Sequence, residues 1–340
     1  MSGSTVSSGA ILGMGNPLLD ISAVVKPELL AKYELKANDA ILYEKEDLFQ
    51  ELQQDYPVEN IAGGATQNSM RVAQWILGQP GVCTFFGCVG QDESGRTLEK
   101  CAQQAGVTVK YQIHAQHPTG KCAVLITGQE RSLVTKLDAA NHFTPDHLEP
   151  NWGVVQAAQI YYSSGFFLTV SPDSMLKVAE YAVAEGKTFA MNLSAPFLPQ
   201  FFSEPMLKVM ALSGLVFGNE TEAAAFAEKQ GYDTKDVAEI ARKIAEIPFK
   251  GSATRTVVIT QGSEPVIVVE NGQTQLYPVD KLSSSQIVDT NGAGDAFVGG
   301  YLAQLALGAD TATAVRCGNY AAKEIIQRSG CTFPETMSFK

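Results

Sequence analysis

A run of small residues followed by an acid, near the C-terminus, has the composition of a phosphate-binding turn. Residues 291–295 read Asn-Gly-Ala-Gly-Asp, and the apolar segment 296–306 that follows is compatible with a helix. The first amides of a helix have no intrahelical acceptor and lie at the positive end of the helix dipole. Because the turn has no large side chains, an anion could approach these amides, with Gly292, Ala293 and Gly294 forming an anion hole.

Asp295 follows this turn directly, and an acid beside a phosphate cradle suits phosphoryl transfer to a hydroxyl group. The backbone would hold the charge of the transferred group while the carboxylate receives the hydroxyl proton. An acid in the first turn of a helix is also an ordinary capping residue. This motif alone leaves both interpretations open, so the rest of the sequence has to decide between them.

The overall composition indicates a globular protein with a large core. Of 340 residues, 45% are hydrophobic and 18% are charged, and the formal net charge is −11 at pH 7. Because no run of Lys or Arg is present, we expect no nucleic-acid partner. No stretch approaches the length of a membrane span, and residues 1–9 lack the features of a leader peptide. We therefore expect no membrane partner and a cytoplasmic location, with the nucleus also open.

Cysteine and histidine residues show no metal-binding pattern in the sequence. The six cysteines are scattered without a Cys-x-x-Cys pair, which is typical of reduced thiols in a core. Cys122 lies in an alternating segment and could face either the core or a ligand. The four histidines, His114, His117, His142 and His147, fall in loop-like settings, and we do not expect a ligand set among them.

Short apolar runs alternate with amphipathic segments along most of the chain, and this alternation predicts the fold. Strands are expected near residues 160–164, 188–192, 215–218 and 256–260, with helices between them. Repeated strand and helix units predict an α/β fold with a doubly wound, mostly parallel sheet. Such sheets bind ligands beyond the carboxyl ends of their strands. Polar or glycine-rich phrases lie at those ends, at residues 15–16, 164–167, 192–194, 218–222 and 260–262.

Two stretches interrupt this alternation. Residues 22–56 are charged and mixed in period, and the extended runs 121–127 and 132–136 flank a predicted hairpin turn at 128–131. Because both stretches are short of core residues, we expect them to pair into one small α/β lid domain. The predicted domains are a large α/β domain of residues 1–16, 65–116 and 142–340, and a lid of residues 17–64 and 117–141.

Several polar residues could bind ligands or only shape the backbone. Asp20, beside a strand end, offers two acceptor oxygens to a pair of ribose hydroxyls or caps a turn. Gly63 and Gly64 precede a helix, where they form a plain turn or bring a ligand against the backbone. Asn219 and Glu222 either cap a helix or hold Mg²⁺ through water.

Residues on the lid and at one strand end leave similar alternatives. Arg131, at the predicted hairpin turn, is a solvated surface residue or a phosphate contact delivered by the lid. Phe166 and Phe167 pack in the core or stack on a base. The chain lacks both the P-loop pattern and the complete dinucleotide-binding fingerprint. A phosphoryl transfer would therefore proceed without a Walker lysine.

Two motifs resemble signatures of the ribokinase-like (PfkB) carbohydrate kinases. Residues 289–297, Asp-Thr-Asn-Gly-Ala-Gly-Asp-Ala-Phe, resemble the C-terminal signature, and residues 63–68, Gly-Gly-Ala-Thr-Gln-Asn, resemble the N-terminal glycine-pair signature. The resemblance covers nearly the whole chain. Further phrases resemble the branch of that family that phosphorylates adenosine, and they lie at residues 15–20, 166–171, 192–197, 219–222 and 330–334.

The resemblance implies a ribokinase-like fold and ATP-dependent phosphorylation of the 5′-hydroxyl of adenosine, giving AMP and ADP in purine salvage. By position, Asp295 would be the catalytic base beside the anion hole, and Arg131 would reach the phosphates. The implied adenosine contacts are Asn16, Asp20, Gly63, Gly64, Asn68, Phe167 and Asn291. The implied nucleotide contacts are Asn192, Asn219, Thr260 and Gly262, with Glu222 ordering Mg²⁺ through water.

The resemblance also sets expectations for cofactors and partners. ATP and Mg²⁺ are implied, and K⁺ is a further candidate because family members often respond to a monovalent cation. Relatives often carry His where this chain has Asn319, near the expected site of the nucleotide adenine. We expect a monomer whose partners are adenosine and MgATP. The alternatives are another nucleoside or sugar kinase of this fold, and a non-catalytic nucleoside-binding protein on the same scaffold.

Overall fold

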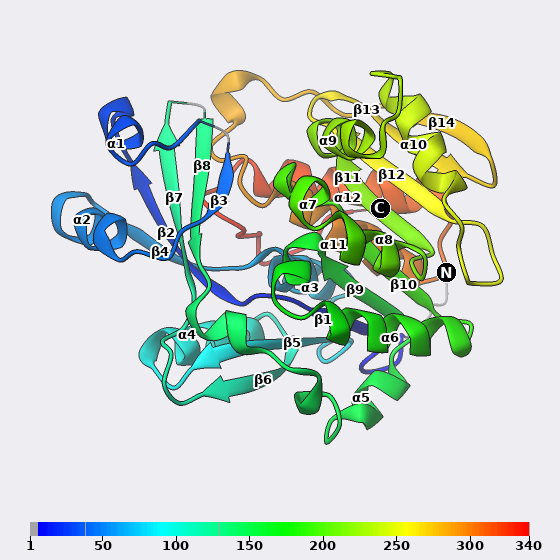
Figure 1. The fold of residues 1–340 in the computed structure, drawn as a ribbon, viewed down its shortest axis with the longest axis horizontal. Helices are drawn as coiled ribbons and strands as arrows, with labels where there is room; N and C mark the ends of the chain where they lie inside the picture. Colours follow the sequence, from blue (N-terminus) through cyan, green and yellow to red (C-terminus); the bar gives the residue numbers. More distant parts are fainter. Residues whose placement is uncertain (1–5, 38, 129, 340) are drawn as a thin grey trace.

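The computed structural model describes residues 6–37, 39–128 and 130–339 and contains two sheets (Figure 1). The larger sheet has nine strands in the order β14-β13-β12-β11-β10-β9-β1-β5-β6. From β12 to β6 every neighbouring pair is parallel, which confirms the predicted doubly wound sheet. At the other edge, β13 and β14 pair antiparallel, an extension that the alternation does not predict. The strands are β1 (Ile11–Met14), β5 (Cys83–Gly90), β6 (Thr108–His114), β9 (Ile160–Ser164), β10 (Thr188–Asn192), β11 (Leu215–Asn219), β12 (Thr256–Gln261), β13 (Glu264–Glu270) and β14 (Gln273–Tyr277).

Both faces of the large sheet are buried, because successive residues of a strand point to opposite sides. In β1, Ile11 packs into one apolar cluster and Leu12 into the other. In β5, Phe85 and Phe86 divide between the same two clusters. Two helical layers are therefore needed to cover the sheet, as the alternating units predict.

One helical layer contains α3 (Ala65–Leu77), α11 (Ala293–Ala306) and α12 (Thr311–Ile325), which pack on one another. Their close approach depends on glycine: a Cβ atom on Gly299 would lie 2.6 Å from Ser69 O, and one on Gly300 would lie 2.6 Å from Cys317 O. The opposite layer contains α6 (Pro172–Ala184), α8 (Ser203–Met210), α9 (Glu220–Gln230) and α10 (Val237–Glu246). The remaining helical segments of this part are α4 (Glu93–Gln104), α5 (Trp152–Ala157), α7 (Phe197–Phe201), η1 (Asp138–His142), η2 (Pro145–His147), η3 (Gly165–Thr169) and η4 (Ser284–Gln286).

The second sheet forms the lid and has five strands in the order β3-β8-β7-β2-β4. Its strands are β2 (Leu18–Val24), β3 (Ala40–Leu42), β4 (Glu59–Gly63), β7 (Lys121–Thr127) and β8 (Glu130–Lys136). All of them come from the residues expected to form the lid, although the domain boundaries themselves stay a prediction. The helices α1 (Pro27–Lys32) and α2 (Asp47–Asp55) cover one face of this sheet.

The lid hairpin is tighter than predicted. Strand β8 begins at Glu130, and Arg131 pairs with Ile126 of β7, so Arg131 is a strand residue and not a turn residue. The strands β7 and β8 are rich in β-branched and apolar residues, which favour strand pairing. Their pairing therefore continues into residues that the polar composition predicts as part of the turn. Gln129, which also belongs to the predicted turn, lies outside the described residues. Within the described ranges, no helix has both the length and the apolar character to span a membrane.

Candidate active site

A cavity of about 230 Å³ lies between the carboxyl ends of the large sheet and the lid. The lid contributes Leu18, Asp20, Ala40, Ile41, Leu42, Gly64, Cys122, Leu133, Thr135 and Leu137. The large domain contributes Asn16, Ala65, Asn68, Ser164, Phe166, Thr169, Asn192, Ser194, Phe197, Glu222, Asn291, Gly292, Gly294 and Asp295. A larger surface hollow of about 890 Å³ beside α6 and α8 contains none of the predicted site residues. The cavity is therefore the candidate active site.

Asp295 lies in the first turn of α11 and opens onto the cavity. Its Oδ2 accepts a hydrogen bond from Asn68 Nδ2 on α3, at 3.0 Å. Burial raises the pKa of Asp295 to about 6, although the bond from Asn68 opposes this shift. A cavity-facing carboxylate with a pKa near neutrality is suited to receive a proton.

The turn before Asp295 has the backbone geometry that an anion hole needs. Gly292 is the N-cap of α11 with φ at 78°, a left-handed conformation that glycine adopts without strain. A Cβ atom on Gly294 would meet no protein atom within 4 Å, so this position leaves space beside the helix terminus. The amide of Ala293 donates to Thr290 O at 3.3 Å, and Ala293 does not line the cavity. Gly292 and Gly294 thus face the cavity, and Ala293 supports the turn.

The glycine pair places the backbone directly against Asp20 and Asn16. A Cβ atom on Gly63 would overlap the carboxylate of Asp20, and one on Gly64 would overlap the carbonyl oxygen of Asn16. Gly64 also has φ at 94°. The resulting close packing lets Asp20 and Gly64 share one wall of the cavity. Gly63 itself lies behind that wall.

Asp20 is buried in an environment of like charge. Burial and the nearby carboxylates of Asp295 and Asp289 raise the pKa of Asp20 to about 8, against the opposing effect of Arg71. Beside it, the side-chain oxygens of Asn16 and Asn68 are buried and have no hydrogen-bond partner among the described residues. Buried acceptors are normally satisfied, so this wall calls for a ligand that donates several hydrogen bonds.

Glu222 and Asn219 form the helix cap that one interpretation predicts, and Glu222 nevertheless faces the cavity. Asn219 Oδ1 accepts from Glu222 N at 2.8 Å, while Asn219 N and Nδ2 donate to Glu222 oxygens at 3.0 and 2.8 Å. Burial raises the pKa of Glu222 to about 7, and hydrogen bonds from the backbone of Asn219 and Ser194 oppose this shift. Asn219 is outside the cavity lining. The cap thus holds a buried carboxylate at the cavity wall.

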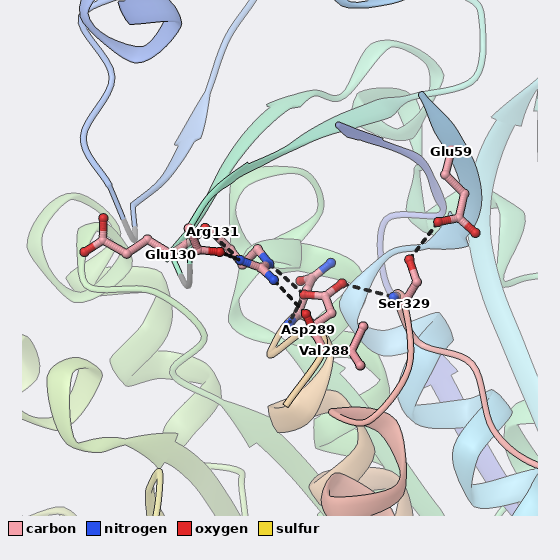
Figure 2. Close-up of polar contacts among 9 residues, drawn as sticks. Glu59, Glu130, Arg131, Val288, Asp289 and Ser329 are labelled. Carbon is pink, nitrogen blue, oxygen red and sulfur yellow. Dashed lines mark hydrogen bonds and ion pairs between the residues drawn. The ribbon is translucent and has the colours of Figure 1, made fainter. Parts of the chain in front are cut away.

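Arg131 joins the lid to the loop that precedes the anion hole (Figure 2). Its Nε donates to Asp289 Oδ1 at 3.0 Å, and its Nη2 donates to Val288 O at 2.9 Å. Asp289 also accepts hydrogen bonds from the amides of Asn291 and Gly330 at 2.9 and 3.0 Å. Arg131 does not line the cavity in this arrangement. It lies close to the anion-hole loop, and its predicted contact with phosphates stays a prediction.

A second contact links the lid to the C-terminal segment. Ser329 Oγ donates to Glu59 Oε2 at 2.7 Å, as Figure 2 shows beside the Arg131 pair. Glu59 begins β4, the strand that ends at the glycine pair. Two contacts therefore join the lid to the large domain near Asp289: one from Arg131 and one from Glu59.

The structure places Phe167 away from the cavity, which differs from the expected adenine contact. Phe167 is fully buried in the core and packs on Phe143, with ring centroids 5.4 Å apart. Phe166 lines the cavity instead. In the tight turn η3, consecutive side chains point in different directions, so only one phenylalanine can face the ligand.

Like Asn219, three further residues expected near the nucleotide lie outside the cavity lining. Thr260 on β12 is paired with Asn219 at the same sheet edge, and Gly262 forms the following turn with φ at 57°. Asn319 on α12 donates to Pro278 O at 3.3 Å. Asn192, at the end of β10, does line the cavity. The first three assignments stay predictions.

The lid wall contains residues that the motifs do not reveal. Leu133, Thr135 and Leu137 line the cavity together with β3. Cys122 is buried there too, and its Sγ accepts a hydrogen bond from Thr135 Oγ1 at 3.4 Å. The signal that could find them is the alternation of β7 and β8, in which every second residue faces one side. Cys122 therefore combines both alternatives: it packs in the apolar cluster with Leu18 and Val124, and it lines the cavity.

We expect no ligand set among the four histidines, yet the structure brings three of them together. The ligand atoms of His114, His117 and His142 lie within 4.8 Å of one another. The connection between β6 and β7 folds back beside η1, which brings residues distant in the sequence together. Sequence spacing alone does not reveal this contact.

The fold and the cavity agree with what comparison with known proteins finds. The family model of the pfkB family carbohydrate kinases matches residues 27–337, and the chain belongs to that family. It is 49% identical to "Adenosine kinase 2" of Arabidopsis thaliana over 344 residues, covering 100% of both chains. Among solved structures, the adenosine kinase of Anopheles gambiae in complex with P1,P4-di(adenosine-5) tetraphosphate has a TM-score of 0.96 and 52% identity, with 98% and 100% of the chains covered. Adenosine kinase from Schistosoma mansoni in complex with adenosine and AMP has a TM-score of 0.91 and 37% identity, with 97% and 98% covered.

Proposed function

We propose that the protein transfers the γ-phosphoryl group of ATP to the 5′-hydroxyl of adenosine, giving AMP and ADP. The observation that carries the proposal is Asp295, which is half-buried beside the glycine turn of α11 and lines the same cavity as Asp20. Full-length relatives that are adenosine kinases support the choice of substrate.

The ribose would lie against the wall formed by Asp20 and Gly64. The two oxygens of Asp20 can accept from the 2′- and 3′-hydroxyls, and the unpartnered oxygens of Asn16 and Asn68 are further acceptors. Asn291 reaches the same cavity from the anion-hole loop. A diol that donates to Asp20 would stabilise its ionised form, because hydrogen bonding to a carboxylate lowers its pKa.

The adenine would occupy the apolar part of the cavity. Phe166 provides an aromatic face from the large domain, while Leu133 and Leu137 approach from the lid. This wall distinguishes a nucleoside from a free sugar, which has no planar apolar group to fill it. We therefore assign the base contact to Phe166 in place of Phe167.

The transfer step uses the helix terminus and Asp295 together. The amides around Gly292 and Gly294 would hold the charge of the transferred group, and Asp295 would receive the proton of the 5′-hydroxyl. In a loose transition state the proton leaves late, so the position of the carboxylate matters more than its basicity. The lid covers the cavity and limits the access of water, which would otherwise accept the phosphoryl group.

The carboxylate of Glu222 fits a role toward Mg²⁺. It is buried at the cavity wall with a raised pKa, and carboxylate oxygens are the ligands that Mg²⁺ prefers, often through water. When bound, Mg²⁺ would neutralise charge on the ATP phosphates. Asn192 lies at the cavity beside it, and Asn219 holds Glu222 in place. A dependence on K⁺ stays a prediction.

The test is purified protein with MgATP and a panel of adenosine, other nucleosides, ribose and fructose, with ADP release as the readout. We expect turnover confined to adenosine and close analogues. Fast turnover with a free sugar would contradict the choice of adenosine and identify the protein as a sugar kinase. Adenosine binding without turnover on any member of the panel would favour a binding protein.

We also propose that the protein is a monomer and acts in the cytoplasm. Its six cysteines are free, and five of them are buried, which suits a reducing compartment. Light scattering of the eluted protein with and without adenosine would test the monomer. A mass of twice that of one chain would contradict it.

A further inference from the structure

Three imidazole rings meet at one place outside the candidate active site. His114 ends strand β6, His117 lies in the connection from β6 to β7, and His142 ends η1. Their ring centroids are 4.2 to 4.8 Å apart in all three pairings. His117 is exposed and the other two are half-buried, so the cluster is open to solvent on one side.

The backbone around this histidine cluster is held by several hydrogen bonds. Gln112 Nε2 donates to His142 O at 2.8 Å, and Gln112 Oε1 accepts from Thr144 N at 3.1 Å. Ala139 N donates to Pro118 O at 2.9 Å, which joins the two chain segments directly. The three side chains thus project from a fixed frame. Only rotation of the side chains is needed to change the distances between their nitrogens.

The three side chains offer the kind of ligand atom that a metal ion needs. A neutral imidazole has a free lone pair on one ring nitrogen, and that lone pair is what a metal ion binds. Because the ligand atoms lie within 4.8 Å of one another, the three rings can present three nitrogens to a single ion.

We propose that His114, His117 and His142 form a binding site for a divalent transition-metal ion that prefers imidazole nitrogen, of which Zn²⁺ is the representative. Three histidine ligands with a fourth position open to water are a common arrangement for Zn²⁺. Zn–N bonds of about 2.0–2.1 Å in a tetrahedron require nitrogens roughly 3.4 Å apart. The nitrogens lie within 4.8 Å of one another at present, and the rings of His117 and His142 are stacked, so binding requires the rings to rotate inward.

One local interaction competes with metal binding and limits the affinity. His114 Nδ1 accepts hydrogen bonds from Gln116 N at 3.2 Å and from His117 N at 3.1 Å. Both bonds are long, and a metal ion must either replace them at Nδ1 or bind Nε2 and shift the proton to Nδ1. We therefore expect a site weaker than a structural zinc site but specific for imidazole-binding metals over Mg²⁺.

The position of the cluster gives the site a consequence for the lid. The chain enters the lid through the segment 115–120, which contains His117, and leaves it through η1, which contains His142. A bound ion would join the outgoing and returning segments at the base of the lid. Metal binding would then stiffen two of the connections on which movement of the lid depends.

The test is titration of the tag-free full-length chain with Zn²⁺ by calorimetry, in the presence of excess Mg²⁺ to occupy carboxylate sites. Co²⁺ serves as a spectroscopic probe, since its visible absorption reports nitrogen coordination. We expect one Zn²⁺ per chain. His117→Asn and His142→Gln should each weaken binding by about tenfold or more, because each removes one of three ligands. Acidification below about pH 6 should weaken it as well, because protons compete for imidazole.

The matched control is His147→Gln, which changes the one histidine outside the cluster. His147 Nε2 contacts Lys110 O at 3.0 Å and takes no part in the three-ring group. This variant should keep the affinity for Zn²⁺ and the Co²⁺ spectrum. Unchanged binding in His117→Asn, with its melting temperature intact, would overturn the proposal. Absence of Zn²⁺ binding to the native chain would overturn it as well.

Discussion

Two acids at helix N-termini, Asp92 on α4 and Asp295 on α11, have opposite environments. The carboxylate of Asp92 accepts hydrogen bonds from Gly95 N, Thr119 N and Thr119 Oγ1, at 2.8, 2.7 and 2.6 Å. Burial alone would raise the pKa of Asp92, but these bonds outweigh it and hold the pKa below its usual range. Asp295 accepts a bond from Asn68, and burial raises its pKa to about 6.

The difference lies in how each acid relates to the helix amides. Asp92 is itself the N-cap, so its side chain turns back onto the backbone of the first turn. Asp295 is the third residue of its helix, and its carboxylate points sideways to Asn68 on α3. The cap of α11 is Gly292, which has no side chain to bind the amides. An acid at the N-cap position occupies the free amides of the first helical turn. Where the N-cap is glycine and the acid lies beside it, those amides stay available to a ligand.

The largest expected effect that separates the two acids is on turnover. Asp295→Asn should lower kcat on the order of 10³-fold, because it removes the proton acceptor. Adenosine binding should change little, since the ribose wall around Asp20 is retained. Steady-state kinetics and calorimetry measure the two effects. Asp92→Asn is the control and should keep kcat within about twofold; near-normal turnover of Asp295→Asn would remove Asp295 from the role of base.

The next effect concerns the backbone that supports the site. In Gly64→Ala the new Cβ would overlap Asn16 O. We expect adenosine affinity to fall by roughly 100-fold, which corresponds to about 3 kcal/mol, the upper end of the cost of local backbone strain. Gly78→Ala is a matched control. Gly78 also has positive φ, at 63°, but a Cβ there would meet nothing within 4 Å. It should cost about 1 kcal/mol of stability and leave adenosine affinity unchanged. Equal affinities in both variants would contradict the tight packing at the glycine pair.

The comparison also predicts the pH dependence of catalysis. Asp295 must be ionised to accept a proton, so kcat/KM should fall as the pH drops. The pKa values of Asp295 and Asp20, about 6 and about 8, bound the apparent value of this acid limb, since the two carboxylates interact. A pH–rate profile for adenosine measures it. Asp92→Asn should leave the profile unchanged, and a profile flat down to about pH 5 would contradict the assignment.

The smallest expected effects are on stability, and they have opposite signs. The pKa of Asp295 is raised from 3.8 to about 6, so its charge costs stability as the pH rises through that window. Asp295→Asn should therefore stabilise the fold at pH 7.5 by ~2 kcal/mol, less than the full shift because the carboxylate opens onto the cavity. The gain should disappear near pH 4. Urea unfolding at both pH values measures this difference in the free energy of unfolding. Destabilisation of the variant at pH 7.5 would contradict the view that the charge of Asp295 costs stability.

Asp92→Asn should do the reverse. The lowered pKa of Asp92 means that its contribution to stability is present at neutral pH and is lost as the pH falls through its folded-state pKa. Asn caps a helix about as well as Asp, so the expected cost of about 1 kcal/mol comes from replacing hydrogen bonds to a charged acceptor by hydrogen bonds to a neutral one. The same urea experiment applies, and a variant as stable as the native chain would show that Thr119 and Gly95 do not depend on the charge.

The sequence predicts those parts of the molecule that depend on local pattern. The apolar alternation of residues such as Ile11 and Leu12 predicts the buried parallel sheet, because each strand needs cover on both faces. The turn before Asp295 is predictable because Gly292 adopts a left-handed backbone conformation, which glycine adopts more readily than other residues. Both signals are contained in a few consecutive residues.

The parts that could not be predicted depend on contacts between distant segments. Which of Phe166 and Phe167 faces the cavity depends on the direction of one tight turn. The meeting of His114 with His142 depends on how the lid connections fold back on the large domain. The antiparallel edge strands are ordinary hairpin sequence, and their place on the sheet is set by tertiary packing.

The lid sheet is assembled from two segments with a stretch of the large domain between them, and this affects how the chain is made on the ribosome. Strand β2 pairs with β4 on one side and with β7 on the other. Because synthesis proceeds from the N-terminus, β2 and β4 emerge well before β7, and one edge of β2 stays unpaired while residues 65–116 are translated. An open edge of this kind can pair with other chains. We therefore expect the N-terminal third of the nascent chain to be most prone to aggregation during this interval, and rapid elongation would shorten it.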